Sequence, residues 1–316
     1  MLNTGLQFSN HHAKLNPNRQ GKVGMAETGA TAASIHGDKL YQERARRAFP
    51  ILVRQAEARK TIYYSDLAEE LGMPNPRNLN YVLGSIGQTL QELSDELNNE
   101  IPPIQCIVIN KSDGMPGEGI GWFLNKESYS GVVPEDFKKL PKLRQKEIVQ
   151  AELQKVYLYD KWREVLEYLS LEPVSDDFSR VLAETRAFGG GESDAHKLLK
   201  EYVAQNPTLI GLPASSPKGQ TEQRLLSGDA LDVSFSLPER WIAAEVKSHI
   251  SGEPDIVRGL FQCVKYKAVM AATQLVEKDQ ASVESVLVLE GELPKHLVPL
   301  RNMLGVTVFQ NVRPAT

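Results

Sequence analysis

The stretch Trp241-Ile242-Ala243-Ala244-Glu245-Val246-Lys247 decides the fold of the second half of the chain. Its side chains are apolar on both faces as far as Ala244, which is typical of a strand inside a sheet that is covered on both sides. Glu245 and Lys247 follow two residues apart, so they point to the same side of that strand near its end. The stretch therefore predicts a central strand of an α/β sheet that ends in an acid and a base.

The preceding segment, Leu231-Asp232-Val233-Ser234-Phe235, predicts a second strand with one apolar and one polar face. An aspartate is unfavourable inside a strand, so Asp232 requires a chemical explanation. Carboxylate oxygens are the ligands that Mg²⁺ prefers, and metal-assisted phosphodiester hydrolysis needs an ion that activates water. Asp232 and Glu245 can supply such a site. Lys247 beside the ion can orient the attacking water and stabilise developing negative charge.

Residues 255–267 predict a helix that follows these two strands. Gln262 and Tyr266 stand one turn apart on a common face, where both can hydrogen-bond across a cleft. An ordinary pair on the helix surface is the alternative explanation for these two residues. The same helix carries positive charge suited to phosphate oxygens, on Arg258, Lys265 and Lys267.

Asp232, the Glu245-Val246-Lys247 stretch and the helix with Gln262-Cys263-Val264-Lys265-Tyr266 together resemble the PD-(D/E)XK nuclease superfamily, over roughly residues 191–309. The resemblance implies a restriction-endonuclease-like mixed central sheet flanked by helices, one or two Mg²⁺ or Mn²⁺ ions, and endonuclease activity on nucleic acid, with DNA as the expected substrate. It matches Asp232 and Glu245 to the metal-binding acids, Lys247 to the catalytic lysine, and the Gln-x-x-x-Tyr pair to the accessory motif. The chain departs from the family pattern in having Ala230-Leu231 before Asp232, where the family has a proline.

Many members of that superfamily also carry an acid on the first helix, which the sequence here predicts over residues 193–205. Glu192 shares a helical face with the apolar residues that we expect to pack on the sheet, so it is the predicted additional metal ligand. Glu201 falls on the predicted solvent side. The spacing of Glu222 does not decide whether it faces the site, and His196 is expected to be a packing or surface residue.

The N-terminal half predicts a winged helix over residues 39–126. A helix, a short β-like segment, a helix capped by Ser65 and a longer helix after Pro76 follow one another in helix-turn-helix order. Residues 104–109 and 120–123 flank a tip rich in Gly and Pro, and this arrangement suits a β-wing.

The predicted winged helix offers candidate nucleic-acid contacts, three at the start of its second motif helix and one in the wing: Arg77, Asn78, Asn80 and Lys111. Residues 63–68 and 102–109 resemble the winged helix of DNA alkyltransferases. The reactive Pro-Cys-His-Arg motif of those enzymes is absent, so Cys106 is expected to be a core residue. Winged helices also bind proteins, so a protein partner through this unit stays open.

Three further segments complete the predicted organisation. Residues 1–38 are rich in Asn, Gly, Ala, Ser and Thr and predict a disordered leader, with Met25 as an alternative start. Residues 134–185 show helical periodicity among many charges and predict a long linking helix. Residues 190–316 then form the predicted nuclease domain.

Composition narrows the function further. A net charge of -4 argues against a chain that coats nucleic acid through bulk charge, so any contact needs a shaped local site. The two cysteines lie far apart, which excludes a disulfide framework or a tetrahedral zinc cluster. No apolar run approaches the roughly 20 residues of a membrane span, so we expect a cytoplasmic protein without a membrane partner. Restriction, phage defence or repair would suit such a nuclease. A non-catalytic nucleic-acid-binding or regulatory protein is the alternative, and a homodimer stays open.

Overall fold

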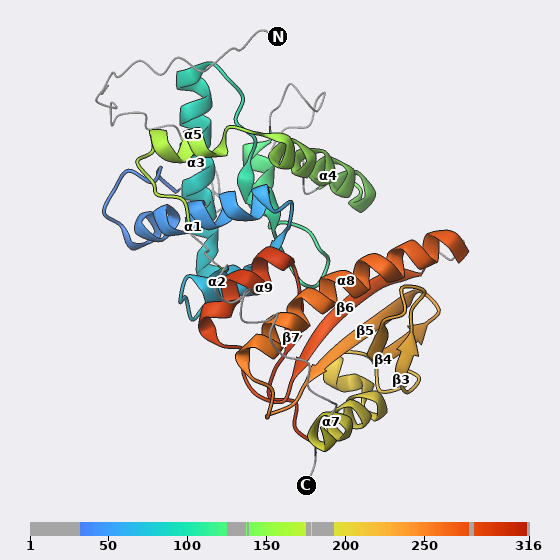
Figure 1. Cartoon of the computed structure of the whole chain (residues 1–316). Helices are drawn as coiled ribbons and strands as arrows, with labels where there is room; N and C mark the ends of the chain where they lie inside the picture. Colours follow the sequence, from blue (N-terminus) through green and yellow to red (C-terminus); the bar gives the residue numbers. More distant parts are fainter. Residues whose placement is uncertain are drawn as a thin grey trace, which may run out of the picture.

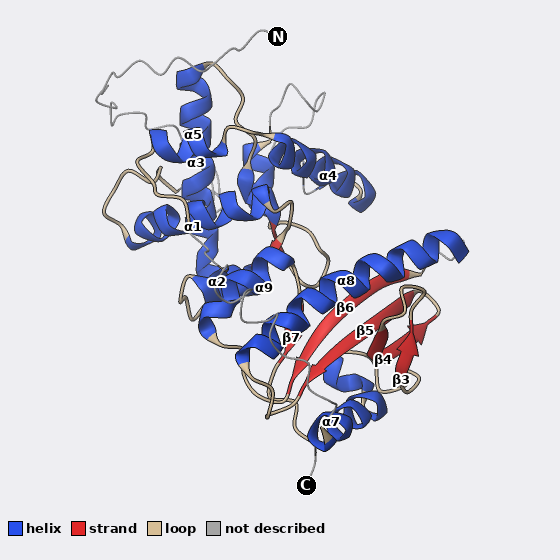
Figure 2. Ribbon diagram, viewed as in Figure 1, coloured by secondary structure: helices blue, strands red, loops and turns tan. Residues whose placement is uncertain are grey.

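The chain is a mixed α/β protein with an open five-stranded mixed sheet in its C-terminal half (Figures 1 and 2). The structure is a computed structural model that describes residues 32–124, 137, 139–174, 178, 193–277 and 281–314. Within these ranges no helix combines the length and the apolar character that a bilayer crossing requires. Most helices of the N-terminal half lie on one side of Figure 1, and the sheet with its flanking helices lies on the other.

The N-terminal half has the helix, strand, helix, helix order that the sequence predicts. Its regular elements are α1 (Leu40–Glu57), β1 (Ile62–Tyr63), α2 (Tyr64–Glu70), α3 (Leu79–Leu97) and β2 (Val108–Ile109). Gly72 ends the first motif helix because it adopts a left-handed conformation with φ 66°. The Asn75 side chain then accepts a hydrogen bond from the Arg77 amide at 3.0 Å, and Pro76 starts the turn that leads into α3.

The predicted β-wing is not formed as a hairpin, which corrects the sequence-based expectation. Residues 104–107 and 118–123 are 3₁₀ helices, and β2 pairs in parallel with β1. A single bridge between Ile109 and Pro116 is the antiparallel pairing found there among the described residues. The side chains of residues 104–107 are all buried, whereas a wing strand exposes every second side chain to solvent. This segment therefore belongs to the core.

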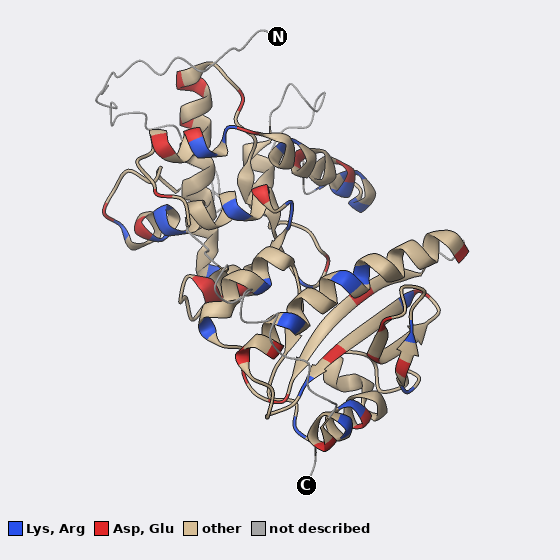
Figure 3. Ribbon diagram, in the orientation of Figure 1, with Lys and Arg blue, Asp and Glu red and all other residues tan. Residues whose placement is uncertain are grey.

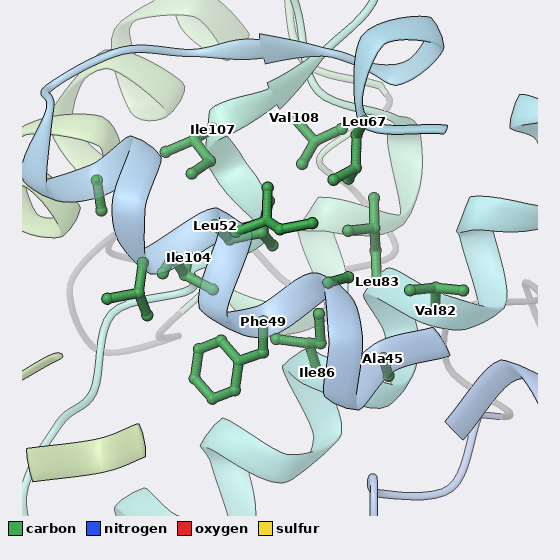
Figure 4. Close-up of a cluster of buried hydrophobic side chains, with 14 of the residues drawn as sticks. Ala45, Phe49, Leu52, Leu67, Val82, Leu83, Ile86, Ile104, Ile107 and Val108 are labelled. Carbon is green, nitrogen blue, oxygen red and sulfur yellow. The ribbon is translucent and has the colours of Figure 1, made fainter. Parts of the chain in front are cut away.

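The predicted long linking helix is replaced by two helices, α4 (Lys142–Leu158) and α5 (Trp162–Tyr168). The chain turns between them because Trp162 packs inward: its indole N–H donates to the Val156 carbonyl at 2.9 Å. Its ring also meets Phe49 of α1 edge-on, with ring centroids 6.4 Å apart. Figure 4 shows Phe49 among the apolar side chains of this core. The linking segment thus completes the N-terminal core instead of spanning between domains.

The predicted leader is too long at its C-terminal end. Ile35 is 1% exposed, and its amide donates to the Thr89 hydroxyl at 3.0 Å. The carbonyl of Ile35 also accepts a hydrogen bond from Arg46. The buried isoleucine, with both of its backbone groups paired, helps to fix this short segment against α1 and α3. Residues 1–31 lie outside the described residues.

The C-terminal half is built on the sheet order β3-β4-β5-β6-β7. Its elements are α7 (Asp194–Gln205), β3 (Gln220–Arg224), β4 (Ala230–Leu237), β5 (Arg240–Lys247), α8 (Glu253–Glu277), β6 (Ser282–Leu289), α9 (Val298–Leu304) and β7 (Thr307–Phe309). The strands from β3 to β5 are antiparallel, and those from β5 to β7 are parallel.

Helices α7 and α8 cover opposite faces of this sheet (Figure 1). Ile242 and Ala244 pack in one cluster with Leu199 of α7, whereas Ala243 packs in another with Met270 of α8. Because side chains alternate along a strand, these clusters lie on the two faces of β5. The prediction of a mixed sheet flanked by helices, with the apolar β5 at its centre, is confirmed.

The two halves meet where α9 lies against α2 and the end of α1 (Figure 1). Arg301 pairs with Glu69 at 3.0 Å, and the Asn302 amide donates to Glu70 at 2.8 Å. Gln55 of α1 donates to the carbonyl of Asn302 at 2.9 Å. This contact is polar and largely buried, and such contacts favour one arrangement because each polar group needs its partner.

Candidate functional site

Asp232 lies at the point where β4 and β5 separate. The pairing between the two strands ends at Val233 and Ala244. Beyond that pair, the amide of Val246 donates to Oδ2 of Asp232 at 2.9 Å, so a side chain replaces a backbone partner. This bond holds the carboxylate beside the end of β5. It also explains physically why an aspartate is accommodated within a strand.

Glu245 and Lys247 form an ion pair near the end of β5, as their spacing predicts. The Lys247 ammonium lies 2.6 Å from Oε1 of Glu245. The two side chains are only 3% and 12% exposed. Oε2 of Glu245 is buried and forms no hydrogen bond within the described ranges. The site therefore contains a carboxylate oxygen that no described protein group satisfies, and such an atom calls for a ligand or a proton.

The two acids differ in charge because their surroundings differ. Burial, together with the nearby carboxylate of Asp232, raises the pKa of Glu245 to about 7, although Lys247 opposes this rise. Burial also tends to raise the pKa of Asp232, but the hydrogen bonds from His196 and from the Val246 amide outweigh it and leave that pKa below its usual value. Asp232 is therefore ionised at neutral pH, while Glu245 is poised between its two forms.

Gly259 of α8 lets that helix approach the ion pair. A Cβ atom at this position would lie 2.9 Å from Cδ1 of Leu287 and 3.1 Å from Cε of Lys247. Both distances are shorter than ordinary van der Waals contact, so a larger residue would displace the lysine or its neighbour. Local periodicity does not single out Gly259 as a functional residue. The available signal was a glycine inside a helix, which costs roughly 1 kcal/mol and usually has a packing or functional reason.

The predicted Gln262–Tyr266 pair joins α8 to the beginning of β4. The Gln262 amide donates to the Tyr266 hydroxyl at 3.3 Å, and that hydroxyl donates to the carbonyl of Ala230 at 3.2 Å. Oε1 of Gln262 is buried and forms no hydrogen bond with any residue that the structure describes. Burial and the carboxylates of Glu245 and Asp232 raise the pKa of Tyr266, so its hydroxyl stays protonated. Tyr266 therefore feels the charge of both acids.

His196 of α7 is the functional candidate that the sequence analysis set aside as a packing or surface residue. Its Nε2 lies 3.4 Å from Oδ1 of Asp232. The signal available in the sequence was its place on the helical face that packs on the sheet. Glu192, the predicted metal ligand of the first helix, lies outside the described residues. Glu222, which the sequence left undecided, pairs with Lys200 of α7 and has a left-handed backbone with φ 56°.

The remaining predicted contacts are spread over two surfaces. On α8, Arg258 pairs with Asp255 at 3.0 Å and Lys265 with Asp229 at 2.6 Å, and Figure 3 shows basic positions in blue along this helix. Both ion pairs must open or share their charge before either cation can bind a phosphate.

In the N-terminal half, the three candidate contacts at the beginning of α3 are exposed: Arg77, Asn78 and Asn80. Lys111 is partly engaged, because it lies 3.3 Å from Asp66 and 5.1 Å from the centre of the Tyr63 ring. These residues come from the N-terminal half, whereas Asp232 lies on β4 of the C-terminal sheet.

Within the described ranges, no group of three or more His, Cys, Asp or Glu side chains is arranged to hold a metal ion by itself. The site is instead described by pairwise contacts of Asp232 with His196 and the Val246 amide, and of Glu245 with Lys247. No family model, curated protein or solved structure matches the chain.

Proposed function

We propose that the C-terminal half hydrolyses nucleic-acid phosphodiester bonds as a metal-dependent endonuclease of the restriction-endonuclease-like kind, with DNA as the expected substrate. The observation that carries the proposal is that the Asp232 carboxylate is held by the amide of Val246, the residue between the buried ion pair of Glu245 and Lys247. Two adjacent carboxylates and an ammonium at the end of an apolar strand are costly to bury without a chemical use. The order of antiparallel and parallel strands also supports this fold.

A divalent cation fits the residues that are present. Burial, together with repulsion from Asp232, raises the pKa of Glu245 to about 7, and Oε2 of Glu245 forms no hydrogen bond with any described residue. These two carboxylates would hold Mg²⁺ or Mn²⁺, both of which favour oxygen ligands. When bound, the cation would supply charge neutralisation and an activated water for phosphodiester hydrolysis.

The protein's own residues contribute position and charge. Lys247 is held beside Glu245 by their ion pair, so its ammonium can orient the attacking water and stabilise the negative charge that develops on the phosphate. Gly259 leaves the space that this lysine occupies. Gln262 and Tyr266 tie α8 to the first residue of β4, the strand that carries Asp232.

The N-terminal half would recruit nucleic acid through the beginning of α3. Arg77, Asn78 and Asn80 are exposed there, and a helix N-terminus favours phosphate. This part of the proposal concerns binding alone, so it can fail while the hydrolytic proposal stands.

The test incubates the full-length protein with plasmid DNA, single-stranded DNA or RNA. Cleavage of each substrate is measured in Mg²⁺, in Mn²⁺ and in excess chelator. We expect cation-dependent cleavage, reduced at least about 100-fold in Glu245→Gln and in Lys247→Met. Glu284→Gln is the matched control. It also removes a carboxylate, but one on β6 that forms a half-exposed ion pair with Arg240 of β5. Binding without cleavage under every metal would instead support the non-catalytic alternative.

A further inference from the structure

The histidine on α7 points at the metal-binding acid of β4. Nε2 of His196 lies 3.4 Å from Oδ1 of Asp232, while Oδ2 of the same carboxylate accepts the Val246 amide. The side chains of His196 and Asp232 are 18% and 16% exposed, so water screens this contact only in part. Both oxygens of the carboxylate therefore have a protein partner.

Helix α7 holds His196 in this position through contacts of residues that precede and follow the histidine in the sequence. Its N-cap is Ser193, whose hydroxyl accepts the His196 amide at 3.2 Å. Leu199 and Val203, on the same face, are fully buried against the sheet. The ring is therefore carried by a helix that can neither slide nor rotate freely. A surface histidine would not be fixed in this way.

We propose that His196 is a positioning residue, which fixes the orientation of the Asp232 carboxylate and thereby sets the affinity of the site for a divalent cation. The effect on the cation rests on the proposed function. Hydrogen bonds from outside a metal site orient its ligands, and removing such a partner typically lowers metal affinity about 10- to 100-fold. A carboxylate held at both oxygens loses little further freedom when a cation binds.

The first test measures Mn²⁺ binding by electron paramagnetic resonance. We expect His196→Leu to weaken Mn²⁺ binding about 10- to 100-fold, and His196→Gln, which keeps an amide donor, to restore most of it. Glu284→Gln should bind Mn²⁺ as the wild type does. Equal affinity in wild type and His196→Leu would overturn the proposal. So would ¹⁴N hyperfine coupling between Mn²⁺ and His196, because it would make the histidine a direct ligand.

A second test needs no cation. In a long-range ¹H–¹⁵N spectrum of the metal-free protein, the His196 ring signals are assigned by their loss in His196→Gln. Asp232→Asn should shift these signals, whereas Glu284→Gln should leave them in place. If the wild type binds no Mn²⁺, the proposed function fails, but this spectrum still decides whether His196 holds Asp232. Unchanged ring signals in Asp232→Asn would refute the contact.

Discussion

Glu245 is a buried acid whose surroundings oppose its negative charge when no cation is bound. Its pKa in the folded chain is raised to about 7 from an ordinary value of 4.5, by burial and by Asp232. The folded chain therefore retains a proton that the unfolded chain has already released between these two pH values. Linkage requires the free energy of unfolding to fall as pH rises through this window, with the full loss present above about pH 7.

Replacing Glu245 by Gln should remove that pH dependence. In chelator, the wild type should lose on the order of 3 kcal/mol of unfolding free energy between pH 4.5 and pH 8, and Glu245→Gln should lose much less. Urea denaturation at pH 5 and pH 8 measures the difference. Adding Mn²⁺ at pH 8 should restore stability to the wild type alone. Parallel pH profiles for the two proteins would refute this account of the buried carboxyl.

Gly259 is the residue whose side chain must be absent for Lys247 to stay in place. Gly259→Ala should lower the unfolding free energy by about 1–2 kcal/mol, because overpacking against Leu287 and Lys247 outweighs the gain in helix propensity. Gly259→Ala should also reduce cleavage, since the displaced Lys247 ammonium no longer contacts the substrate. Gly252→Ala is the control, because a Cβ there meets Pro254 at an ordinary 3.6 Å. Equal behaviour of the two variants would contradict this role.

At the scale of elements, the Gln262–Tyr266 pair fastens α8 to the first residue of β4. Tyr266→Phe removes the hydroxyl that donates to the Ala230 carbonyl, and we expect a loss of about 1 kcal/mol of unfolding free energy. A double-mutant cycle with Gln262→Ala should give a coupling energy above zero, because the two side chains share that hydroxyl. Additive effects in urea denaturation would show that the pair does not act as a unit.

The beginning of α3 and the segment that carries Lys111 differ in the charge that they can offer to nucleic acid. Arg77→Ala should weaken binding and lower the salt dependence by about one counterion, because this arginine is exposed. Lys111→Ala should have a smaller effect, since its ammonium already pairs with Asp66. Fluorescence anisotropy at several salt concentrations compares the two variants. A larger effect of Lys111→Ala would reassign the binding surface.

At the scale of the whole molecule, α9 joins the two halves through buried polar contacts with α2 and α1. Arg301 is 7% exposed and pairs with Glu69 at 3.0 Å and with Asp66 at 3.9 Å, so its removal takes the cation from Glu69 and leaves Asp66 with Lys111 alone among the described cations. Arg301→Ala should cost about 1–3 kcal/mol at this contact. Calorimetry should then resolve two unfolding transitions in place of one. Arg313→Ala, which changes an exposed arginine, should leave the profile unchanged.

The elements that local periodicity dictates could be predicted from the sequence. The apolar run before Glu245 identified a strand buried on both faces, and the spacing to Lys247 placed both charges together. The helical spacing of Gln262 and Tyr266 placed them on one face of α8. These predictions succeeded because each depends on a repeat of two or about 3.6 residues within a single element.

The predictions of the β-wing and of the long linking helix were wrong, because packing between distant segments decides these two elements. Residues 104–107 read as a strand, but the N-terminal core buries them on every side as a 3₁₀ helix. The periodicity of residues 142–168 spans two helices, because Trp162 turns inward to reach Phe49. The periodicity of a sequence indicates which face of an element is apolar. The other elements that pack against this face decide where the element ends.

The sequence by itself determined the central strand, the two acids, the lysine and the helix that follows them, because alternation and helical spacing are local properties of the chain. Only the tertiary structure decided that His196 faces Asp232, that Gly259 makes room for Lys247, and that α9 meets α2. Each of these contacts joins residues that are distant along the chain. Their proximity follows from how the sheet twists and where its helices dock, which no local pattern encodes.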